Sequence, residues 1–295
     1  MTNRLVLASL SGAMDGGLTA IAEVAEILAG GGKLTECRLI GGVAVLLHQQ
    51  RLAIDLPLRA TGDADFGLPS YLLREPELVA AIEKRGYRKV LGNRWERPID
   101  ATRVASVDLL IPTYRSRARD TVRVGDVVTT EVPGLAEALR RPGIEADVEI
   151  VLTDGATIGA HVLIPDAAST LGLKAWARTV RQESRDAEDL WRCLEIALAD
   201  GVTAATLHDD ATLAQIVPIL RRELGPSGPS LDVITAGVTE AEGRPPSDPH
   251  SCAPRGRRRH HRIAAIGRFN EQPAGGRSPA PGRTRSGQRD HRPTR

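Results

Sequence analysis

The feature that most constrains this chain is a glycine pair followed by three spaced carboxylates. Gly41-Gly42 comes after a short apolar run and opens a helix-like segment that continues to Gln50. Asp63 and Asp65 follow, and Asp108 lies in a later apolar run. Side chains at positions i and i+2 of a strand point to the same face. Asp63 and Asp65 are therefore predicted to stand side by side.

Asp108 is predicted to lie on a second strand, on the same face as Ser106 and Leu110. If the two strands pair, three carboxylates meet in a small volume, and they repel unless a cation joins them or they take up protons. Mg²⁺ prefers carboxylate oxygens and usually arrives with substrate phosphates. The Gly41-Gly42 turn offers backbone N–H groups to such a phosphate at a helix start. The plainer interpretation is a solvated strand edge with a chance glycine turn.

Composition divides the chain near residue 225. Residues 225–295 carry 13 Arg, no Lys and 6 Asp and Glu, whereas residues 1–224 carry 26 basic and 31 acidic residues. The sequence pI of about 8.6 is therefore a property of the tail. The body shows no bulk nucleic-acid signature, so any RNA contact it makes must be local.

The tail, residues 225–295, is rich in Gly, Pro, Ser and Arg and has few large apolar residues. Such a segment buries too little surface to offset its ordering entropy, and we predict that it is disordered. It resembles the product of GC-rich DNA read in a shifted frame, which would leave it without function. The alternative is a basic tail around Arg257–His261 that tethers RNA.

Cysteine spacing and hydropathy exclude several classes of protein. Cys37, Cys193 and Cys252 are far apart, which argues against a disulfide framework or a structural zinc site. No apolar run reaches the length of a membrane span, and the sequence predicts a soluble, cytoplasmic protein with no membrane partner.

Hydrophobic periodicity predicts an α/β (α+β) core over residues 1–165, a helical C-terminal part over 166–224, and the disordered tail. Asp166 and Ser184 are predicted to cap the first two helices of the helical part. The predicted strands cover residues 37–40, 63–68, 87–91, 104–111, 122–124, 127–130, 148–152 and 157–164. The predicted helices cover residues 18–29, 43–51, 75–85, 135–140, 167–181, 185–199 and 204–224.

Two charged residues of the helical part are further candidates for a site. Lys174 lies beside the packed stripe of its helix, where a lysine is costly unless its ammonium finds an anion or reaches solvent. Asp186, at the start of the next helix, lies nearer the apolar stripe than Asp189 on a helical wheel. The plain explanation of Asp186 is charge complementing the helix dipole, which does not explain its orientation.

These segments together resemble the nucleotidyltransferase superfamily. Its members carry a hydrophobic-Gly-Gly turn, an acid-hydrophobic-acid-hydrophobic strand and a lone acid in a later strand. Here those segments are Ile40-Gly41-Gly42, Asp63-Ala64-Asp65-Phe66 and Val107-Asp108-Leu109. The resemblance implies a nucleotidyltransferase-like α/β fold and transfer of a nucleotide from an NTP.

The chain is also similar to the AbiEii/MenT branch, the toxins of a class of toxin–antitoxin systems. That branch has a Ser/Thr-x-Asp strand motif, a helical Lys and an Arg/Lys-Asp-x-x-Asp-Leu motif. Here these are Thr61-Gly62-Asp63, Lys174 and Arg185–Leu190, and the resemblance covers residues 35–200. The chain departs at Ala187-Glu188, where the family often has a Leu-Tyr-like pair.

The resemblance implies how the first part of the site would work. Asp63 and Asp65 would hold Mg²⁺ on the NTP phosphates. Gly41 and Gly42 would cradle a phosphate, and Thr61 would bond phosphate or orient Asp63.

The resemblance also implies the roles of the remaining residues and the partners. Lys174 would pair with the triphosphate, and Asp108 and Asp186 are candidates for activating the attacking hydroxyl. The acceptor would be a tRNA 3′ end, and a cognate antitoxin would be a protein partner. Three arginines are candidates for local contacts to RNA phosphate: Arg59, Arg178 and Arg185.

Two other functions remain open from the sequence. One is nucleotidyl transfer to a small molecule, as antibiotic nucleotidyltransferases perform, and the acidic body slightly favours such an acceptor. The other is a catalytically silent nucleotide-binding regulator, against which the intact Asp63 and Asp65 argue.

Overall fold

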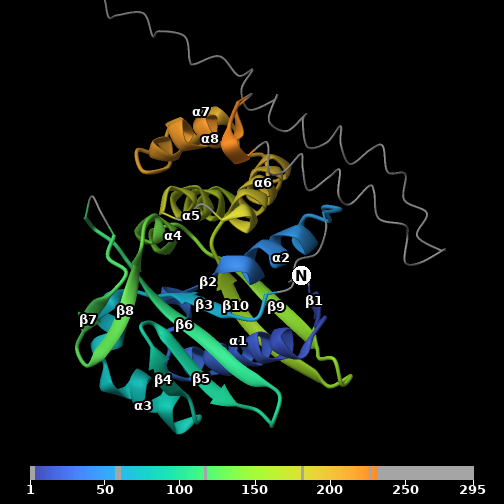
Figure 1. Ribbon diagram of the computed structural model, residues 1–295, viewed down its shortest axis with the longest axis vertical. Coiled ribbons are helices and arrows are strands. Elements are labelled where there is room, and N and C mark those ends of the chain that lie inside the picture. Colours follow the sequence, from blue (N-terminus) through green and yellow to red (C-terminus); the bar gives the residue numbers. More distant parts are fainter. Residues whose placement is uncertain (1–3, 57–60, 116–117, 181–182, 226, 231–295) are drawn as a thin grey trace, which may run out of the picture.

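A computed structural model describes residues 4–56, 61–115, 118–180, 183–225 and 227–230 (Figure 1). Every strand within this part of the chain precedes Pro165, and helices alone follow it. In Figure 1 the helices α5 to α8 lie together at one end of the molecule and the sheets at the other. The predicted α/β core with a helical C-terminal part is therefore confirmed, and the division into domains stays a prediction.

The strands of the described residues form two sheets. The smaller has the order β1-β9-β10, and the larger has the order β2-β3-β6-β5-β4, with β8 pairing with β6 and with β7. The strands of the smaller sheet are β1 (Arg4–Ala8), β9 (Ile144–Val151) and β10 (Thr157–Ile164). Those of the larger sheet are β2 (Arg38–Ile40), β3 (Ala64–Gly67), β4 (Arg88–Leu91), β5 (Arg94–Pro98), β6 (Val104–Pro112), β7 (Val122–Val124) and β8 (Val127–Val132).

The helices of the sheet-bearing part cover these sheets. The helix α1, whose start is capped by the Ser11 side chain, packs against β6 of the larger sheet and β10 of the smaller one, so it lies between the two. The helices of this part are α1 (Gly12–Gly30), α2 (Gly41–Arg51), α3 (Pro76–Lys84) and α4 (Leu135–Arg140).

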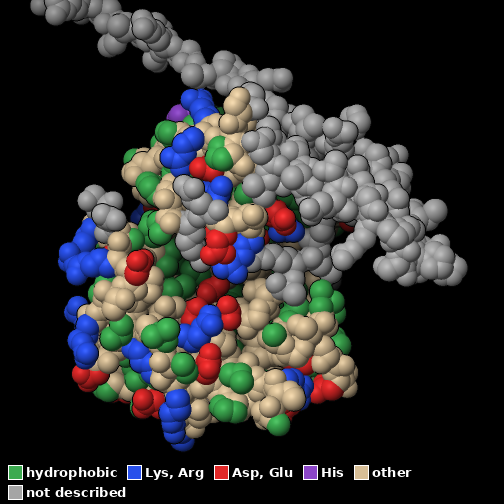
Figure 2. All heavy atoms as spheres, viewed as in Figure 1, with side chains coloured by type: hydrophobic (Ala, Val, Ile, Leu, Met, Phe, Trp, Pro, Cys, Tyr) green, Lys and Arg blue, Asp and Glu red, His purple; other side chains and the backbone are tan. Residues whose placement is uncertain are grey.

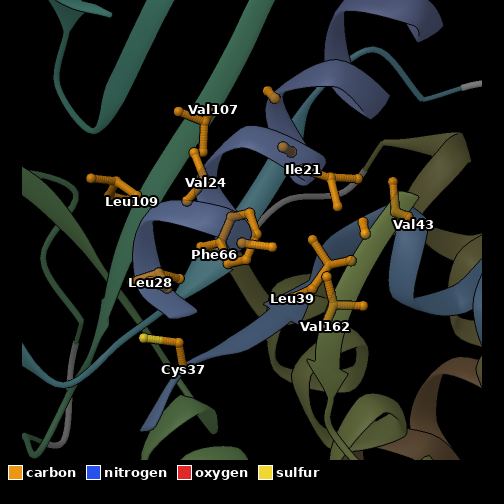
Figure 3. Close-up of a cluster of buried hydrophobic side chains, with 14 of the residues drawn as sticks. Ile21, Val24, Leu28, Cys37, Leu39, Val43, Phe66, Val107, Leu109 and Val162 are labelled. Carbon is orange, nitrogen blue, oxygen red and sulfur yellow. The ribbon is translucent and has the colours of Figure 1, made fainter. Parts of the chain in front are cut away.

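Alternation along β3 and β6 puts the core on one face of the larger sheet and the acids on the other. Figure 3 shows side chains of α1 packed around Phe66 on the apolar face. Phe66 and Val107 are fully buried there, whereas Asp65 and Asp108 alternate with these apolar residues and are only half-buried. The strands β3 and β6 are parallel neighbours, with Asp65 directly opposite Asp108, so the condition set in the sequence analysis, that these two strands pair, is met.

The helical part has its own core, to which α2 also contributes through Val45. Its helices are α5 (Ala167–Val180), α6 (Ser184–Ala199), α7 (Ala204–His208) and α8 (Val217–Leu224). The Asp166 carboxylate accepts a bond of 2.7 Å from the Ser169 amide at the start of α5, as predicted for a cap. The predicted cap at Ser184 is wrong, because Glu183 occupies that position and Ser184 is the first helical residue.

Three further expectations differ from the structure or lie outside it. The predicted helix over 204–224 is broken, because Asp210 accepts bonds from the amides of Thr212 and Leu213 and ends the run between α7 and α8. The strands β1 and β5 were not predicted. Cys252 and the tail from residue 231 onward lie outside the described residues.

No helix of the described residues is long and apolar enough to cross a membrane.

A buried histidine joins α2 to the start of the helical part. The Nε2 atom of His48 lies 2.9 Å from the Pro165 carbonyl, and an Arg51 guanidinium N–H lies 3.3 Å from Nδ1. A neutral ring that donates from Nε2 and accepts at Nδ1 satisfies both contacts. Burial, with Arg51 as a second cause, lowers the pKa of His48 to about 4.

His48 should make the protein sensitive to acid. The unfolded chain takes up this proton near the ordinary histidine pKa, so stability is lost as pH falls from 6.5 to about 4. The expected loss is about 3 kcal/mol in the free energy of unfolding. Urea unfolding at neutral and acidic pH measures it. His48→Gln should show a smaller loss, and the matched change at the half-exposed His161, His161→Gln, should retain the full loss. An equal loss in both variants would contradict this assignment.

Candidate active site

The site begins at the glycine turn that links β2 to α2. Gly41 is the first residue of α2 and has a left-handed φ of +72°. A Cβ added there would overlap the carboxylate of Asp65, because Ile40 and Asp65 are direct neighbours in the antiparallel β2–β3 pair. Glycine at this position therefore allows both the turn and its close approach to the acid.

The second glycine faces Thr61. A Cβ added at Gly42 would lie 3.1 Å from the Thr61 hydroxyl oxygen, so little space separates them. Thr61 and Asp63 precede β3, and Asp63 lies two residues before Asp65. The start of α2, the Thr61 hydroxyl and the acids of this segment thus come together, as the sequence predicted.

Arg94 of β5 links two of the predicted acids. Its Nε lies 3.2 Å from Oδ1 of Asp108, and its Nη2 lies 3.3 Å from Oδ2 of Asp108 and 3.1 Å from Oδ2 of Asp63. The hydrogen bond with Asp108 raises the pKa of Arg94, so the guanidinium stays charged. A fixed positive charge therefore stands between Asp63 and Asp108.

The three acids lie on one side of the larger sheet, but their arrangement is not that of a three-ligand metal site. Among the described residues, no three His, Cys, Asp or Glu side chains are arranged so that they could hold a metal ion. Asp65 and Asp108 are nonetheless direct neighbours, and Arg94 contacts both Asp108 and Asp63, so the three acids lie near one another. Arg94 supplies a compensating charge between Asp63 and Asp108, and the expected metal site stays a prediction.

Lys174 of α5 meets its anion on α6. Its Nζ lies 2.8 Å from Oδ2 of Asp189, and the two side chains are 14% and 4% exposed. Arg192 approaches the other Asp189 oxygen at 3.3 Å. The expected need of Lys174 for an anion is therefore met by Asp189 and not by solvent.

The wheel-based ranking of the two α6 acids does not hold in the structure. Asp186 and Asp189 are both buried, with 5% and 3% of their surfaces exposed. Asp186 lies in the first turn of α6, as predicted, and Asp189 is the acid that bonds to Lys174.

The helix that carries Lys174 packs onto the glycine turn. Leu173 shares a small apolar cluster with Ile40, the residue before Gly41, and with Leu135 and Ala138 of α4. In the space-filling view the surface is hollowed between the helical part and the sheets, with acidic and basic side chains along its edge (Figure 2). The helix α5 therefore lies against the turn that leads into α2.

Two of the three arginines predicted to contact RNA phosphate are described, and they differ in exposure and in partners. Arg178 is 5% exposed and its Nε lies 3.0 Å from Glu223, so the expectation that it meets RNA phosphate is wrong. Arg185 is exposed and pairs with Glu183 at 2.5 Å, which leaves its contact with RNA a prediction. Arg59 lies outside the described residues.

Sequence reasoning missed Arg94, and it gave no role to Asp189, although Asp189 is the second acid of the Asp-x-x-Asp motif. The repeated acids in Asp186-Ala187-Glu188-Asp189 could have pointed to Asp189, since a helix brings residues three apart onto neighbouring positions. Arg94 carried no such signal, because it reaches Asp108 only through the register of β5 against β6.

Comparisons with known proteins identify no family for this chain. No protein-family model matches the chain, and no curated protein matches it. The chain is similar to the solution structure of the antibiotic-resistance factor ANT(2'')-Ia, at 16% identity and a TM-score of 0.36. The similarity covers 76% of this chain and 96% of that one. A likeness at this level establishes neither family nor activity.

Proposed function

We propose that this protein transfers a nucleoside monophosphate from an NTP to an RNA hydroxyl, at a tRNA 3′ end, as the toxin of a toxin–antitoxin pair. The observation that carries nucleotidyl transfer is the contact between the Gly41 turn and Asp65. There a helix start with space for no side chain adjoins a carboxylate that stands beside a second one, Asp63. Backbone N–H groups suited to a phosphate thus adjoin oxygens suited to its metal.

The donor set fits Mg²⁺. This ion is commonly bound by one or two carboxylates together with substrate phosphates and water, and Asp63 and Asp65 are two such carboxylates, both partly exposed. When bound, Mg²⁺ would neutralise charge on the phosphates and on the pyrophosphate leaving group. Asp63 and Asp65 would be its ligands.

The chain's own residues would position the nucleotide. The amides of Gly41 and Gly42 would bind phosphate oxygens, and the Thr61 hydroxyl beside Gly42 would add a donor or orient Asp63. Lys174 has three N–H donors, of which the bond to Asp189 uses one, so its ammonium would also pair with the triphosphate.

The acceptor hydroxyl would attack the α-phosphorus of the NTP. The bond from that phosphorus to the bridging oxygen breaks, pyrophosphate leaves, and the hydroxyl proton passes to a carboxylate. Asp108, held in place by Arg94, and Asp186, in the first turn of α6, are the candidates for this base. General-base catalysis of this kind contributes roughly a hundredfold or more.

The proposal is tested by incubating the full chain with each labelled NTP and Mg²⁺, with total tRNA or with a mixture of cationic small molecules. We expect label on tRNA in a denaturing gel, and none after chelation. Label on the small molecules alone would replace the RNA acceptor with an antibiotic-type one. Nucleotide binding without incorporation of any label would support the alternative function, a catalytically silent nucleotide-binding regulator.

Growth tests the toxin role separately. Cells that express the chain should arrest, and cells that express Asp63→Asn should not. Transfer to tRNA without growth arrest would support the enzymatic activity and contradict the toxin role. Rescue by a neighbouring gene would identify the antitoxin.

A further inference from the structure

Arg94 is held in place by the end of a hairpin. The turn between β4 and β5 contains Gly92 with a left-handed φ of +55°. The Asn93 carbonyl accepts a bond of 3.0 Å from the Leu109 amide, and Arg94 stands directly opposite Asp108 in the antiparallel β5–β6 pair. The backbone therefore fixes which acid Arg94 faces.

The two contacts of Arg94 are unequal. With Asp108 the guanidinium makes a two-pronged contact, at 3.2 and 3.3 Å, and the Asp108 side chain is only 15% exposed. With Asp63 it makes one contact at 3.1 Å, and that carboxylate is 46% exposed. A forked contact with a well-covered carboxylate outlasts a single contact that solvent screens.

We propose that Arg94 is a resident counter-cation of this site, which stays on Asp108 and yields Asp63 to an incoming divalent ion. In the protein without nucleotide, its positive charge occupies the place beside Asp63 that the ion would take. Binding of the ion exchanges one partner of Asp63 for another, while the fork to Asp108 continues to orient that carboxylate. Arg94 is thus a positioning residue, and it weakens metal binding until a nucleotide adds its own phosphate ligands.

This inference rests on the proposed function for the role of Asp63 as a metal ligand. Its physical basis is that like charges repel and that both cations use the same carboxylate. Removing the guanidinium therefore makes the empty site more anionic and removes a competitor. The consequence concerns metal affinity in the absence of nucleotide, which is measurable without any activity.

The test is Mn²⁺ binding to the full chain without nucleotide, measured by titration calorimetry. Arg94→Gln should bind Mn²⁺ about fivefold or more tightly than the wild type. Adding Asp63→Asn to Arg94→Gln should abolish that gain. Unchanged or weaker Mn²⁺ binding in Arg94→Gln would overturn the proposal.

Arg97 provides a matched control. It lies on the same strand, and it pairs with Glu23 of α1 at 2.7 Å instead of the acids of the site. Arg97→Gln should leave Mn²⁺ affinity unchanged. An equal gain in both variants would mean that overall charge, and not the place of Arg94, sets the affinity, and it would also overturn the proposal.

A second measurement needs no Arg94→Gln protein. In the wild type labelled with ¹⁵N-arginine, Mg²⁺ should shift the side-chain N–H signals of Arg94 and leave those of Arg97 in place. Arg94→Lys, which retains the charge, assigns the signal. Arg94 signals that do not move at Mg²⁺ concentrations that saturate the site in calorimetry would overturn the exchange at Asp63.

The outcomes separate this inference from the proposed function. Tighter Mn²⁺ binding in Arg94→Gln without label transfer from any NTP would support the counter-cation role of Arg94 and contradict the proposed nucleotidyltransferase activity. Asp63-dependent transfer with unchanged Mn²⁺ binding in Arg94→Gln would support the proposed nucleotidyltransferase activity and contradict the counter-cation role of Arg94.

Discussion

Asp63→Asn and Asp65→Asn are expected to lower nucleotidyl transfer by about a hundredfold or more. Each change retains the shape of the side chain and removes the charge of a proposed metal ligand. Stability should change little, because the Asp63 carboxylate is 46% exposed and its contact with Arg94 is that of a partly exposed pair. Label incorporation, measured beside thermal unfolding, checks both expectations.

Asp147 is a matched control for this pair of variants. It is also a strand aspartate with a side-chain partner, Nδ1 of His161 at 2.6 Å, and its side chain is 49% exposed on the smaller sheet. Asp147→Asn should therefore leave transfer unchanged. Full transfer by both Asp63→Asn and Asp65→Asn would refute the proposed nucleotidyltransferase activity.

Lys174→Met should lower transfer by a factor of about ten to more than a hundred. The change retains the aliphatic stem and removes the charge-assisted bond proposed between Lys174 and the triphosphate, worth roughly 1.5–3 kcal/mol. It also removes the bond to Asp189, but Arg192 still faces that carboxylate at 3.3 Å, so the protein should remain folded. Transfer rates, measured well below the melting temperature, give the effect on catalysis alone.

Two companion variants separate catalysis from structure. Asp189→Asn retains the ammonium and should retain more transfer than Lys174→Met. If Lys174 only neutralises Asp189, the double variant Lys174→Met/Asp189→Asn should recover transfer, which would remove Lys174 from the mechanism. Lys174→Arg should not restore full activity, because a broad planar guanidinium replaces a compact charge.

Lys33→Met provides the control for loss of a lysine ion pair. Lys33 bonds to Glu75 at 3.0 Å, and its side chain is partly covered, 28% exposed. It precedes β2 and lies outside the proposed site, so its loss should leave transfer unchanged. A reduction as large as that of Lys174→Met would assign both effects to altered stability.

The strands that carry the acids could be predicted because their signal is local. Alternation of Ala64 and Phe66 with Asp63 and Asp65 defines two faces, and the later run around Asp108 does the same. A buried apolar face fixes the register of such strands, since a slip of one residue would turn the acids into the core. The shared face of the acids follows directly.

The strands β1 and β5 lack that signal. β5 reads Arg-Trp-Glu-Arg-Pro, and Trp95 is its one fully buried side chain. Its place beside β6 depends on pairing across the turn that links them, in which Asp100 bonds to Thr102 and Arg103. The partner of Asp108 could therefore not be predicted, because the contact of Arg94 is set by tertiary pairing.

The two acids of α6 illustrate a different limit. A helical wheel ranks residues by assuming one buried stripe and one solvated face. The helix α6 packs against both α5 and α2, so buried positions extend around more of its circumference. Asp189 is consequently buried despite its position off the stripe, and it takes Lys174 as its partner.

The residue at position 41 shows, from the sequence of a related chain alone, whether that chain can form the same turn beside Asp65. Any residue with a Cβ would push into the Asp65 carboxylate and would also have to adopt a left-handed backbone. A related chain with alanine or serine there, but with both acids intact, would retain the proposed metal ligands without the turn that brings backbone donors to them. Under the proposed function, such chains are the ones in which to look for nucleotide-independent roles of this fold.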